Sequence, residues 1–172
     1  MEFYLIRHPL PAVAPGTCYG RTDLDVAEDV AAVAARIAPA LPENVVLYTS
    51  PLQRCRKLAQ ALHPSPRADA RLQEMDFGQW EMRPWDAIGR TTINAWVADR
   101  LGYRPPGGET VGELQARVLM FLDECSASGH PAVALVTHAG VIKVLSGALR
   151  GLAPAAWFSL EFEYGSVTRL KW

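Results

Sequence analysis

Two short, β-rich apolar segments each end at a histidine, and this pairing constrains the fold more than any other feature of the chain. The first segment spans Glu2–Ile6 and leads into Arg7-His8, and the second spans Ala132–Val136 and leads into Thr137-His138. Short apolar segments of this kind are typical of buried strands. In α/β proteins, side chains at the carboxyl ends of strands line the crevice where ligands bind. The two segments therefore indicate an imidazole pair that faces one anion, although either histidine alone is equally compatible with a semi-buried residue that satisfies a local hydrogen bond.

Apolar patterns of helical and strand type alternate along the chain. The capping-box pattern of Thr110 and Glu113 predicts a helix from there to about Ser126. Helices that alternate with strands imply a three-layer α/β/α sandwich with a mostly parallel central sheet and an antiparallel edge. The other predicted helices are Val26–Ala38, Leu52–Leu62, Trp85–Leu101 and Val141–Leu149; the strands are Glu2–Ile6, Val45–Tyr48, Arg67–Leu72 and Ala132–Val136; and a closing hairpin joins Phe158–Phe162 to Ser166–Lys171 around Gly165.

The composition is ordinary for a globular enzyme without a strongly charged partner. The chain has 172 residues, 49% of them hydrophobic, and a formal net charge of −1. This length suits a single domain, residues 1–172, with a sizeable core. The near-neutral charge argues against nucleic acid or an anionic membrane as a partner, so any anion site must be built locally. The composition leaves both a monomer and a homodimer open.

Cysteine usage and the N-terminal segment bear on the compartment. Cys18, Cys55 and Cys125 are odd in number and widely spaced, which indicates reduced thiols and argues against disulfides and a zinc site. The N-terminal residues lack a basic segment followed by a long apolar one, and no stretch is apolar over the length that spans a bilayer. We therefore expect a cytoplasmic protein without a signal peptide or a membrane span.

Two further side chains are candidates for the same site. Arg54 lies one turn into the helix after the second strand, where its guanidinium would point toward the same sheet edge and bind a phosphate through paired hydrogen bonds. An isolated helix arginine is more often solvated. Glu74 follows another predicted strand, and Phe77 and Trp80 would form an apolar wall of the kind that raises a carboxyl pKa, as a general acid requires. Glu74 and Asp76 are also compatible with ordinary surface carboxylates.

Four segments together resemble the histidine phosphatase superfamily, the phosphoglycerate-mutase-like enzymes, over nearly the full length of the chain. Each segment alone is weak evidence, but four of them in the family order at sensible spacing are strong evidence. Two further segments, Cys18–Asp23 and Pro105–Thr110, look most like the α-ribazole-5′-phosphate phosphatases of cobalamin synthesis. The four family segments are Leu5-Ile6-Arg7-His8, Thr49-Ser50-Pro51-Leu52-Gln53-Arg54, Leu72-Gln73-Glu74-Met75-Asp76-Phe77-Gly78-Gln79-Trp80-Glu81 and Val136-Thr137-His138-Ala139-Gly140-Val141-Ile142.

The resemblance implies a phosphoglycerate-mutase-like fold and a metal-independent phosphoric monoester hydrolase of the histidine acid phosphatase type. His8 would be the nucleophile and would form a phosphohistidine. Arg7, Arg54 and His138 would surround the phosphoryl group, because positioning and positive charge do most of the catalysis of its transfer. Glu74 would protonate the leaving alkoxide and then take a proton from the attacking water. The substrate would be a small-molecule phosphate ester, and no cofactor or metal ion is implied.

The chain departs from the family pattern directly after His8. The family commonly continues with Gly, then Glu or Gln, then Thr, whereas this chain has Pro9-Leu10-Pro11. Pro9 has no N–H to donate, so phosphate binding must depend more on the arginines. Arg21 is a candidate for an extra phosphate contact, and the alternative is a loop arginine paired with Asp23 or Asp25.

The segment 79–108 is predicted to be a lid or specificity cap whose tryptophans suit a flat leaving group such as a benzimidazole nucleoside. The alternative is a packing insert whose tryptophans fill the core. The leading function is an α-ribazole-5′-phosphate phosphatase in cobalamin biosynthesis. The enzymatic alternatives from the same superfamily are a broad-specificity phosphatase, a protein-phosphohistidine phosphatase and a phosphoglycerate mutase, and the non-enzyme alternative is a phosphate-binding pseudoenzyme.

Overall fold

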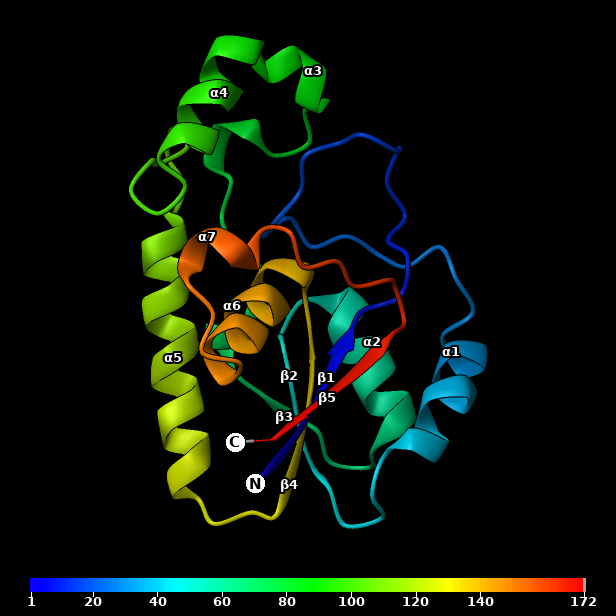
Figure 1. Ribbon diagram of the computed structural model, residues 1–172. Coiled ribbons are helices and arrows are strands. Elements are labelled where there is room, and N and C mark those ends of the chain that lie inside the picture. Colours follow the sequence, from blue (N-terminus) through cyan, green and yellow to red (C-terminus); the bar gives the residue numbers. More distant parts are fainter. Residues whose placement is uncertain (172) are drawn as a thin grey trace.

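A five-stranded sheet forms the centre of the computed structural model, which describes residues 1–171 (Figure 1). The strand order across the sheet is β3-β2-β4-β1-β5. The first four strands of the chain run parallel and β5 pairs antiparallel with β1, so the predicted mostly parallel sheet with an antiparallel edge is confirmed. The strands are β1 (Glu2–Arg7), β2 (Val46–Thr49), β3 (Arg67–Ala68), β4 (Ala132–Thr137) and β5 (Val167–Lys171).

Helices cover both faces of the sheet, and the predicted three-layer α/β/α sandwich is confirmed. α1 and α2 pack together on one face, and α5, α6 and α7 pack on the other (Figure 1). The helices are α1 (Val30–Ile37), α2 (Gln53–Leu62), α3 (Trp85–Ile88), α4 (Arg90–Ala98), α5 (Val111–Ala127), α6 (Ala139–Leu149) and α7 (Pro154–Trp157), with short 3-10 turns at Ala38–Ala40, Ala70–Leu72 and Gly78–Trp80.

The side chains of β1 alternate between two apolar cores, because successive residues of a strand point to opposite faces of the sheet. Phe3 and Leu5 belong to the core under α5 and α6. Tyr4 and Ile6 belong to the core under α1 and α2. β4 is buried along its whole length, which explains why its sequence is a continuous apolar run.

The predicted closing hairpin is wrong in its first strand. Residues Phe158–Phe162 form no strand, and β5 pairs with β1 instead. β5 is the edge strand of the sheet, and within residues 1–171 no strand pairs with its other side. The carbonyl oxygen of Phe162 accepts a hydrogen bond from Nη1 of Arg7 at 2.6 Å, so this segment serves the site and not the sheet. The helix α7, directly before it, was not predicted.

The strand predicted over Arg67–Leu72 is also wrong beyond its second residue. Only Arg67–Ala68 pairs with β2. The carboxylate of Asp69 accepts a hydrogen bond from the backbone N–H of Arg71 at 2.8 Å, which starts the 3-10 turn Ala70–Leu72. This turn follows the edge strand β3 and leads the chain away from the sheet toward Glu74.

Two predicted helices differ from the structure at specific residues. The helix predicted over Val26–Ala38 begins at Val30, because the Asp29 carboxylate accepts hydrogen bonds from the first N–H groups and acts as the N-cap. The helix predicted over Trp85–Leu101 is broken at Gly89, whose φ of +99° separates α3 from α4. The predicted capping box, by contrast, is confirmed at the start of α5.

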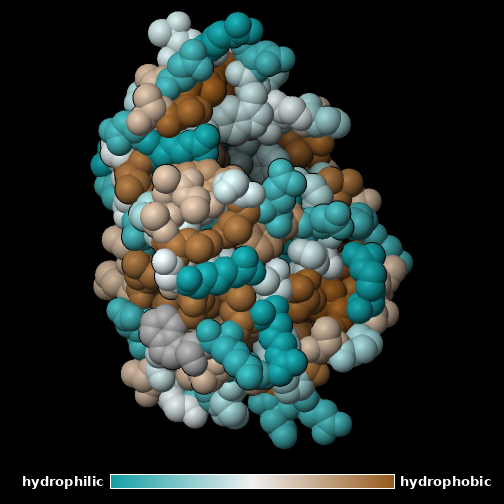
Figure 2. Space-filling model, in the orientation of Figure 1, coloured by the Kyte–Doolittle hydropathy of each residue, from teal (hydrophilic) through white to brown (hydrophobic). Residues whose placement is uncertain are grey.

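The helices α3 and α4 lie beyond the carboxyl ends of the parallel strands, at the top of Figure 1. Both belong to the segment 79–108, which we call the cap segment. In Figure 2 the surface is hollowed between this part of the molecule and the body that contains the sheet. Among residues 1–171, no helix combines the length and the apolar character that a membrane crossing requires.

Candidate active site

His8 and His138 meet because their strands are neighbours in register. β1 and β4 run parallel, and Arg7, the last residue of β1, lies opposite Thr137, the last residue of β4. The next residue on each strand is a histidine, so both imidazoles leave the sheet at the same level. Their ring centroids are 5.1 Å apart, with the ring planes inclined at 59°. The imidazole pair predicted from the sequence is therefore formed.

The ring of His8 is held in the state that a nucleophile needs. Its Nδ1 lies 2.7 Å from the carbonyl oxygen of Pro9, which can only accept, so Nδ1 carries the proton and Nε2 keeps its lone pair. His8 is 2% exposed. Burial, followed by the positive charge of Arg54, lowers its pKa to about 3. Pro9 lacks an N–H, but it still supplies the carbonyl group that fixes the tautomer.

His138 is completely buried beside β2. Its Nε2 lies 2.8 Å from Oγ of Ser50 and 3.4 Å from Sγ of Cys55. Burial is the main cause that lowers the pKa of His138 well below its ordinary value, and the charge of Arg54 adds to the effect. Burial also raises the pKa of the Cys55 thiol, so this cysteine is a protonated packing residue next to the imidazole.

Arg54 is buried and points from α2 toward the loop after β1. It is 0% exposed, and its two terminal nitrogens donate to the carbonyl oxygens of Thr22 at 2.7 Å and Gly20 at 2.6 Å. Its Nε is buried without a hydrogen-bond partner among residues 1–171. The guanidinium is thus held rigidly with one nitrogen, Nε, left without a partner, and a buried donor of this kind requires an acceptor such as a phosphate oxygen.

Arg7 is fixed in a similar way from the opposite side. Its Nη1 is bonded to the backbone of Phe162, and its guanidinium carbon lies 3.7 Å from the ring centroid of Tyr164. Its Nε, like that of Arg54, is buried and unpaired within the described part of the chain. The Tyr164 hydroxyl lies 2.8 Å from that of Tyr19, which joins the two aromatic rings that flank the arginines.

Glu74 lies at the amino end of α6, directly beside the turn that carries His138. Its Oε1 accepts from the backbone N–H of Met75 and its Oε2 from that of Gly140, each at 3.0 Å. A Cβ added to Gly140 would stand 2.3 Å from Oε1, so the glycine provides the room that the carboxyl group occupies. The structure therefore brings Glu74 to the histidine pair, as the sequence predicted.

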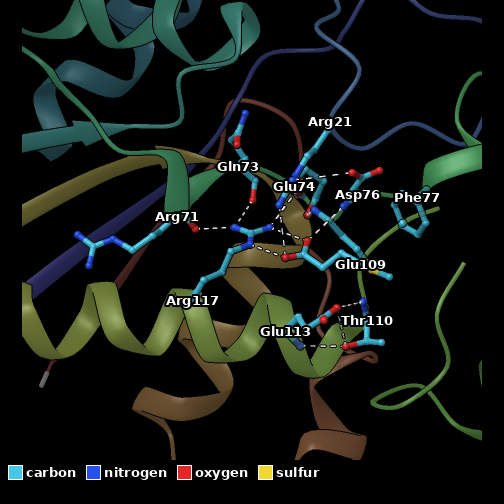
Figure 3. A network of polar contacts seen from close by, with 12 residues as sticks. Arg21, Arg71, Gln73, Glu74, Asp76, Phe77, Glu109, Thr110, Glu113 and Arg117 are labelled. Atoms are coloured by element: carbon cyan, nitrogen blue, oxygen red, sulfur yellow. Dashed lines mark hydrogen bonds and ion pairs between the residues drawn. The ribbon is translucent and has the colours of Figure 1, made fainter.

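Arg21 lies between two carboxylates. Its guanidinium lies 3.4 Å from Oε1 of Glu109 and 3.8 Å from Oδ2 of Asp76 (Figure 3). It is not among the described residues that line the cavity beside His8. Arg54 and His138 are absent from that lining as well, so the phosphate contact expected of Arg21 stays a prediction. The alternative partners, Asp23 and Asp25, do not hold it.

A cavity of about 520 Å³ opens beside His8. Arg7, His8 and Glu74 lie in its wall, and Arg7 is the only lysine or arginine among the described lining residues. The rest of the lining is mostly apolar or aromatic and consists of Leu10, Pro11, Val13, Ala14, Pro15, Gly16, Thr17, Tyr19, Phe77, Trp85 and Tyr164.

The tryptophans of the cap segment have different roles. Trp80 is 2% exposed and stacks on Tyr103 at 5.9 Å, so it is a core residue of the cap. Trp85 lines the cavity beside His8. Trp96 lines a smaller cavity of about 170 Å³, which shares Phe77 and Glu74 with the first. Trp80 thus fills the core as the packing interpretation expects, and a substrate contact of Trp85 or Trp96 stays a prediction.

Several residues near the site had no signal in the sequence. Tyr164 precedes the glycine turn before β5, and no motif marks it. Arg117 lies in the middle of α5, where it looks like a surface arginine, but it contacts the backbone around Glu74. Within residues 1–171, no group of three or more His, Cys, Asp or Glu side chains is arranged to hold a metal ion.

A model of the "Histidine phosphatase superfamily (branch 1)" matches residues 3–172 of the chain. Among curated proteins, the chain is similar to one of Hydrogenobacter thermophilus named "Putative phosphoserine phosphatase 2". The two are 25% identical over 180 residues, which covers 98% of this chain and 88% of the relative.

Solved structures agree over the whole fold. The TTHB049 protein of Thermus thermophilus is 30% identical, with a TM-score of 0.81 over 100% of this chain and 94% of its own. A mycobacterial glucosyl-3-phosphoglycerate phosphatase, solved in complex with inorganic phosphate, is 28% identical, with a TM-score of 0.84 over 99% of this chain and 89% of its own.

Proposed function

The chain belongs to the histidine phosphatase superfamily (branch 1), and from this premise we propose that it hydrolyses phosphate monoesters through a phosphohistidine on His8 without a metal ion. The observation that carries the proposal is the state of His8 itself. Its Nδ1 is bonded to a carbonyl oxygen and its pKa is lowered to about 3, so Nε2 is a free lone pair at neutral pH. The nearby charges of Arg54 and Arg7 are suited to the dianion that this lone pair would attack.

In the first step, Nε2 of His8 attacks phosphorus while the bond from phosphorus to the leaving oxygen breaks. Arg7, Arg54 and His138 surround the transferred group, and the unpaired Nε atoms of the two arginines supply donors for its oxygens. Glu74, in its protonated form, transfers its proton to the leaving oxygen, so the product leaves as a neutral alcohol.

In the second step, a water molecule attacks the phosphohistidine. Glu74, now a carboxylate, takes one proton from that water as the new bond to phosphorus forms. The bond from phosphorus to Nε2 breaks, its electron pair returns to His8, and inorganic phosphate is released. That a mycobacterial relative was solved with inorganic phosphate supports an anion site of this kind in the fold.

The wall of the cavity favours a substrate whose alcohol part is uncharged and flat. Phosphoserine and phosphoglycerates carry a carboxylate, which requires a cation besides those that hold the phosphate. Arg7 is the one lysine or arginine in the described lining, and it is assigned to the phosphoryl group. The remaining wall is apolar, with Phe77 and Trp85 meeting edge to face at 5.5 Å.

We therefore propose α-ribazole 5′-phosphate, an intermediate of cobalamin synthesis, as the substrate. Its benzimidazole would lie against Trp85 and the loop Leu10–Pro15, and the cap segment would cover it. Burying such a ring is worth a 10- to 100-fold gain in kcat/KM, on the order of 1.5–3 kcal/mol.

The experiment is phosphate release in EDTA from α-ribazole 5′-phosphate, ribose 5-phosphate, phosphoserine, 3-phosphoglycerate and p-nitrophenyl phosphate. We expect kcat/KM for the ribazole ester to exceed that for ribose 5-phosphate by about 10- to 100-fold. Trp85→Leu should reduce this ratio, and Val97→Ala, which alters an exposed apolar residue of the cap segment outside the cavity, is the control.

Each other outcome has a defined meaning. Equal values for the ribazole and ribose esters would refute the named substrate and leave a broad-specificity phosphatase. Faster release from phosphoserine or 3-phosphoglycerate would refute the uncharged substrate class. Release that occurs only when a divalent metal replaces EDTA would refute the metal-independent mechanism, and no release from any ester would favour a pseudoenzyme.

A further inference from the structure

A buried ion pair lies directly beneath Glu74. Arg117, on α5, contacts Glu109 twice, with Nε 2.7 Å from Oε1 and Nη2 2.9 Å from Oε2. The two side chains are 16% and 10% exposed. A bidentate pair in this environment has a well-defined geometry, because both partners are planar and bonded through two parallel hydrogen bonds.

The other donors of Arg117 hold the chain that leads to Glu74 (Figure 3). Nη1 donates to the carbonyl oxygens of Arg71 at 2.6 Å and Gln73 at 2.8 Å. Nη2 donates to the carbonyl oxygen of Glu74 itself at 3.1 Å. An arginine has five N–H donors, and here each of them has an acceptor.

Glu109 holds the chain on the other side of Glu74. Its Oε2 accepts from the backbone N–H of Asp76 at 3.3 Å, and its own backbone N–H donates to the carbonyl oxygen of Asp76 at 2.8 Å. No helix or strand contains residues 73–77, so the pair supplies the hydrogen bonds that regular structure would otherwise supply. The backbone of Glu74 is thus fixed from both directions.

We propose that Arg117 and Glu109 are positioning residues that set the place of the Glu74 carboxyl group for proton transfer. The proposal rests on the proposed function, in which Glu74 protonates the leaving oxygen. A displacement of about 1 Å in a reacting group can cost on the order of 100-fold in rate. Transfer of the phosphoryl group from an ester with a poor leaving group therefore depends on the pair more than transfer from an ester whose leaving group needs no acid.

The test compares Arg117→Lys with the wild-type enzyme on two esters. Benzyl phosphate has a poor leaving group that needs the acid, whereas p-nitrophenolate leaves without it. We expect kcat/KM, which reports the steps up to departure of the leaving group, to fall about 100-fold for benzyl phosphate and by less than about threefold for p-nitrophenyl phosphate. Arg104→Lys is the matched control, because Arg104 makes a similar two-bond pair with Glu113 at the exposed start of the same helix.

A second readout separates positioning from general support of the fold. In a Glu74→Gln background, Arg117→Lys should cause no further loss on benzyl phosphate, since the group it positions is already absent. An equal loss on both esters, or an additive loss in the double variant, would overturn the proposal. If Arg117→Lys does not fold, Glu109→Gln, which keeps the size of the side chain, replaces it in the same comparison.

A crystal structure of the variant makes the test independent of activity. In Arg117→Lys, the contact between Oε2 of Glu74 and the Gly140 N–H, 3.0 Å in the wild-type chain, should be lost or lengthened. An unchanged contact would overturn the positioning role even if no ester is hydrolysed. A wild-type protein that hydrolyses neither ester would instead contradict the proposed function.

Discussion

The low pKa of His8 predicts a specific dependence of stability on pH. In the folded protein the pKa is lowered to about 3 by burial and by Arg54, whereas the unfolded chain has the ordinary value of 6.5. Below pH 6.5 the unfolded chain therefore binds a proton that the folded protein does not bind. The free energy of unfolding must fall as the pH falls, from about 6.5 down to about 3.

The magnitude follows from the two pKa values. Between about pH 7.5 and about pH 5.0, the proton taken up by the unfolded chain at His8 should lower the free energy of unfolding by about 2 kcal/mol. The perturbation is His8→Asn, which removes the titrating group and leaves a polar side chain in the buried site. His138 is present in both proteins, so its own contribution cancels to first approximation.

The assay is urea unfolding of both proteins at the two pH values, followed by tryptophan fluorescence. The wild-type protein should lose about 2 kcal/mol more than His8→Asn between the two conditions. Equal losses would mean that His8 titrates normally in the folded protein. That result would refute the claim that the buried imidazole of His8 is neutral well below pH 6.5, and with it the low pKa as a reason to assign His8 as the nucleophile.

Three further substitutions test other parts of the site. Gly140→Ala should lower kcat for alkyl phosphates about 10- to 100-fold, because a Cβ 2.3 Å from Oε1 displaces the Glu74 carboxyl group. The melting temperature should not fall, because alanine suits a helix. A parallel loss of stability would contradict this explanation. Glu74→Gln should lower kcat/KM for benzyl phosphate far more than kcat/KM for p-nitrophenyl phosphate, and an equal fall would argue against Glu74 as the acid. Arg54→Lys should lower kcat/KM by about 100-fold or more. It should also destabilise the fold by about 1–3 kcal/mol, measured by urea unfolding, because the carbonyl oxygens of Gly20 and Thr22 lose their donors. Wild-type kinetics would exclude Arg54 from the phosphate site.

The parts of the site that could be predicted depend on strand periodicity and register. An apolar run that ends at a histidine identifies the end of a buried strand, and two parallel neighbours bring such ends together. His8, His138, Arg54 and Glu74 were found in this way or through the family segments, and the structure brings these four to one place. Their roles in catalysis stay predictions.

The parts that could not be predicted depend on contacts between distant residues. Asp23 and Asp25 lie close to Arg21 in the sequence, but its partners in the structure are Asp76 and Glu109. A charged residue on a loop finds its partner through the tertiary fold, and no local pattern records that choice. The contacts of Arg117 could not be predicted for the same reason. The carbonyl groups of Arg71, Gln73 and Glu74 that it contacts lie 43 to 46 residues away along the chain.

The prediction of a hairpin strand over Phe158–Phe162 was wrong for a related reason. Alternating apolar residues at Phe158–Phe162 resemble a strand, and β5 has a free edge at which such a strand could pair. In the structure, Phe158 and Phe162 pack against the core, and the carbonyl oxygen of Phe162 accepts a hydrogen bond from Arg7. Strand propensity reflects how well side chains suit a half-buried surface. Here the segment has such a surface without forming the backbone hydrogen bonds of a sheet.

The central claim is that His8 carries the phosphoryl group during turnover, and trapping that intermediate tests it most directly. The enzyme is mixed with p-nitrophenyl phosphate in EDTA, quenched within milliseconds in alkali, which preserves the acid-labile phosphorus–nitrogen bond, digested and examined by mass spectrometry. We expect one phosphoryl group on the peptide that contains His8, and neither phosphopeptide nor phosphate release from His8→Ala. Phosphate release at the wild-type rate from His8→Ala, or a phosphoryl group found only on another residue, would contradict the account.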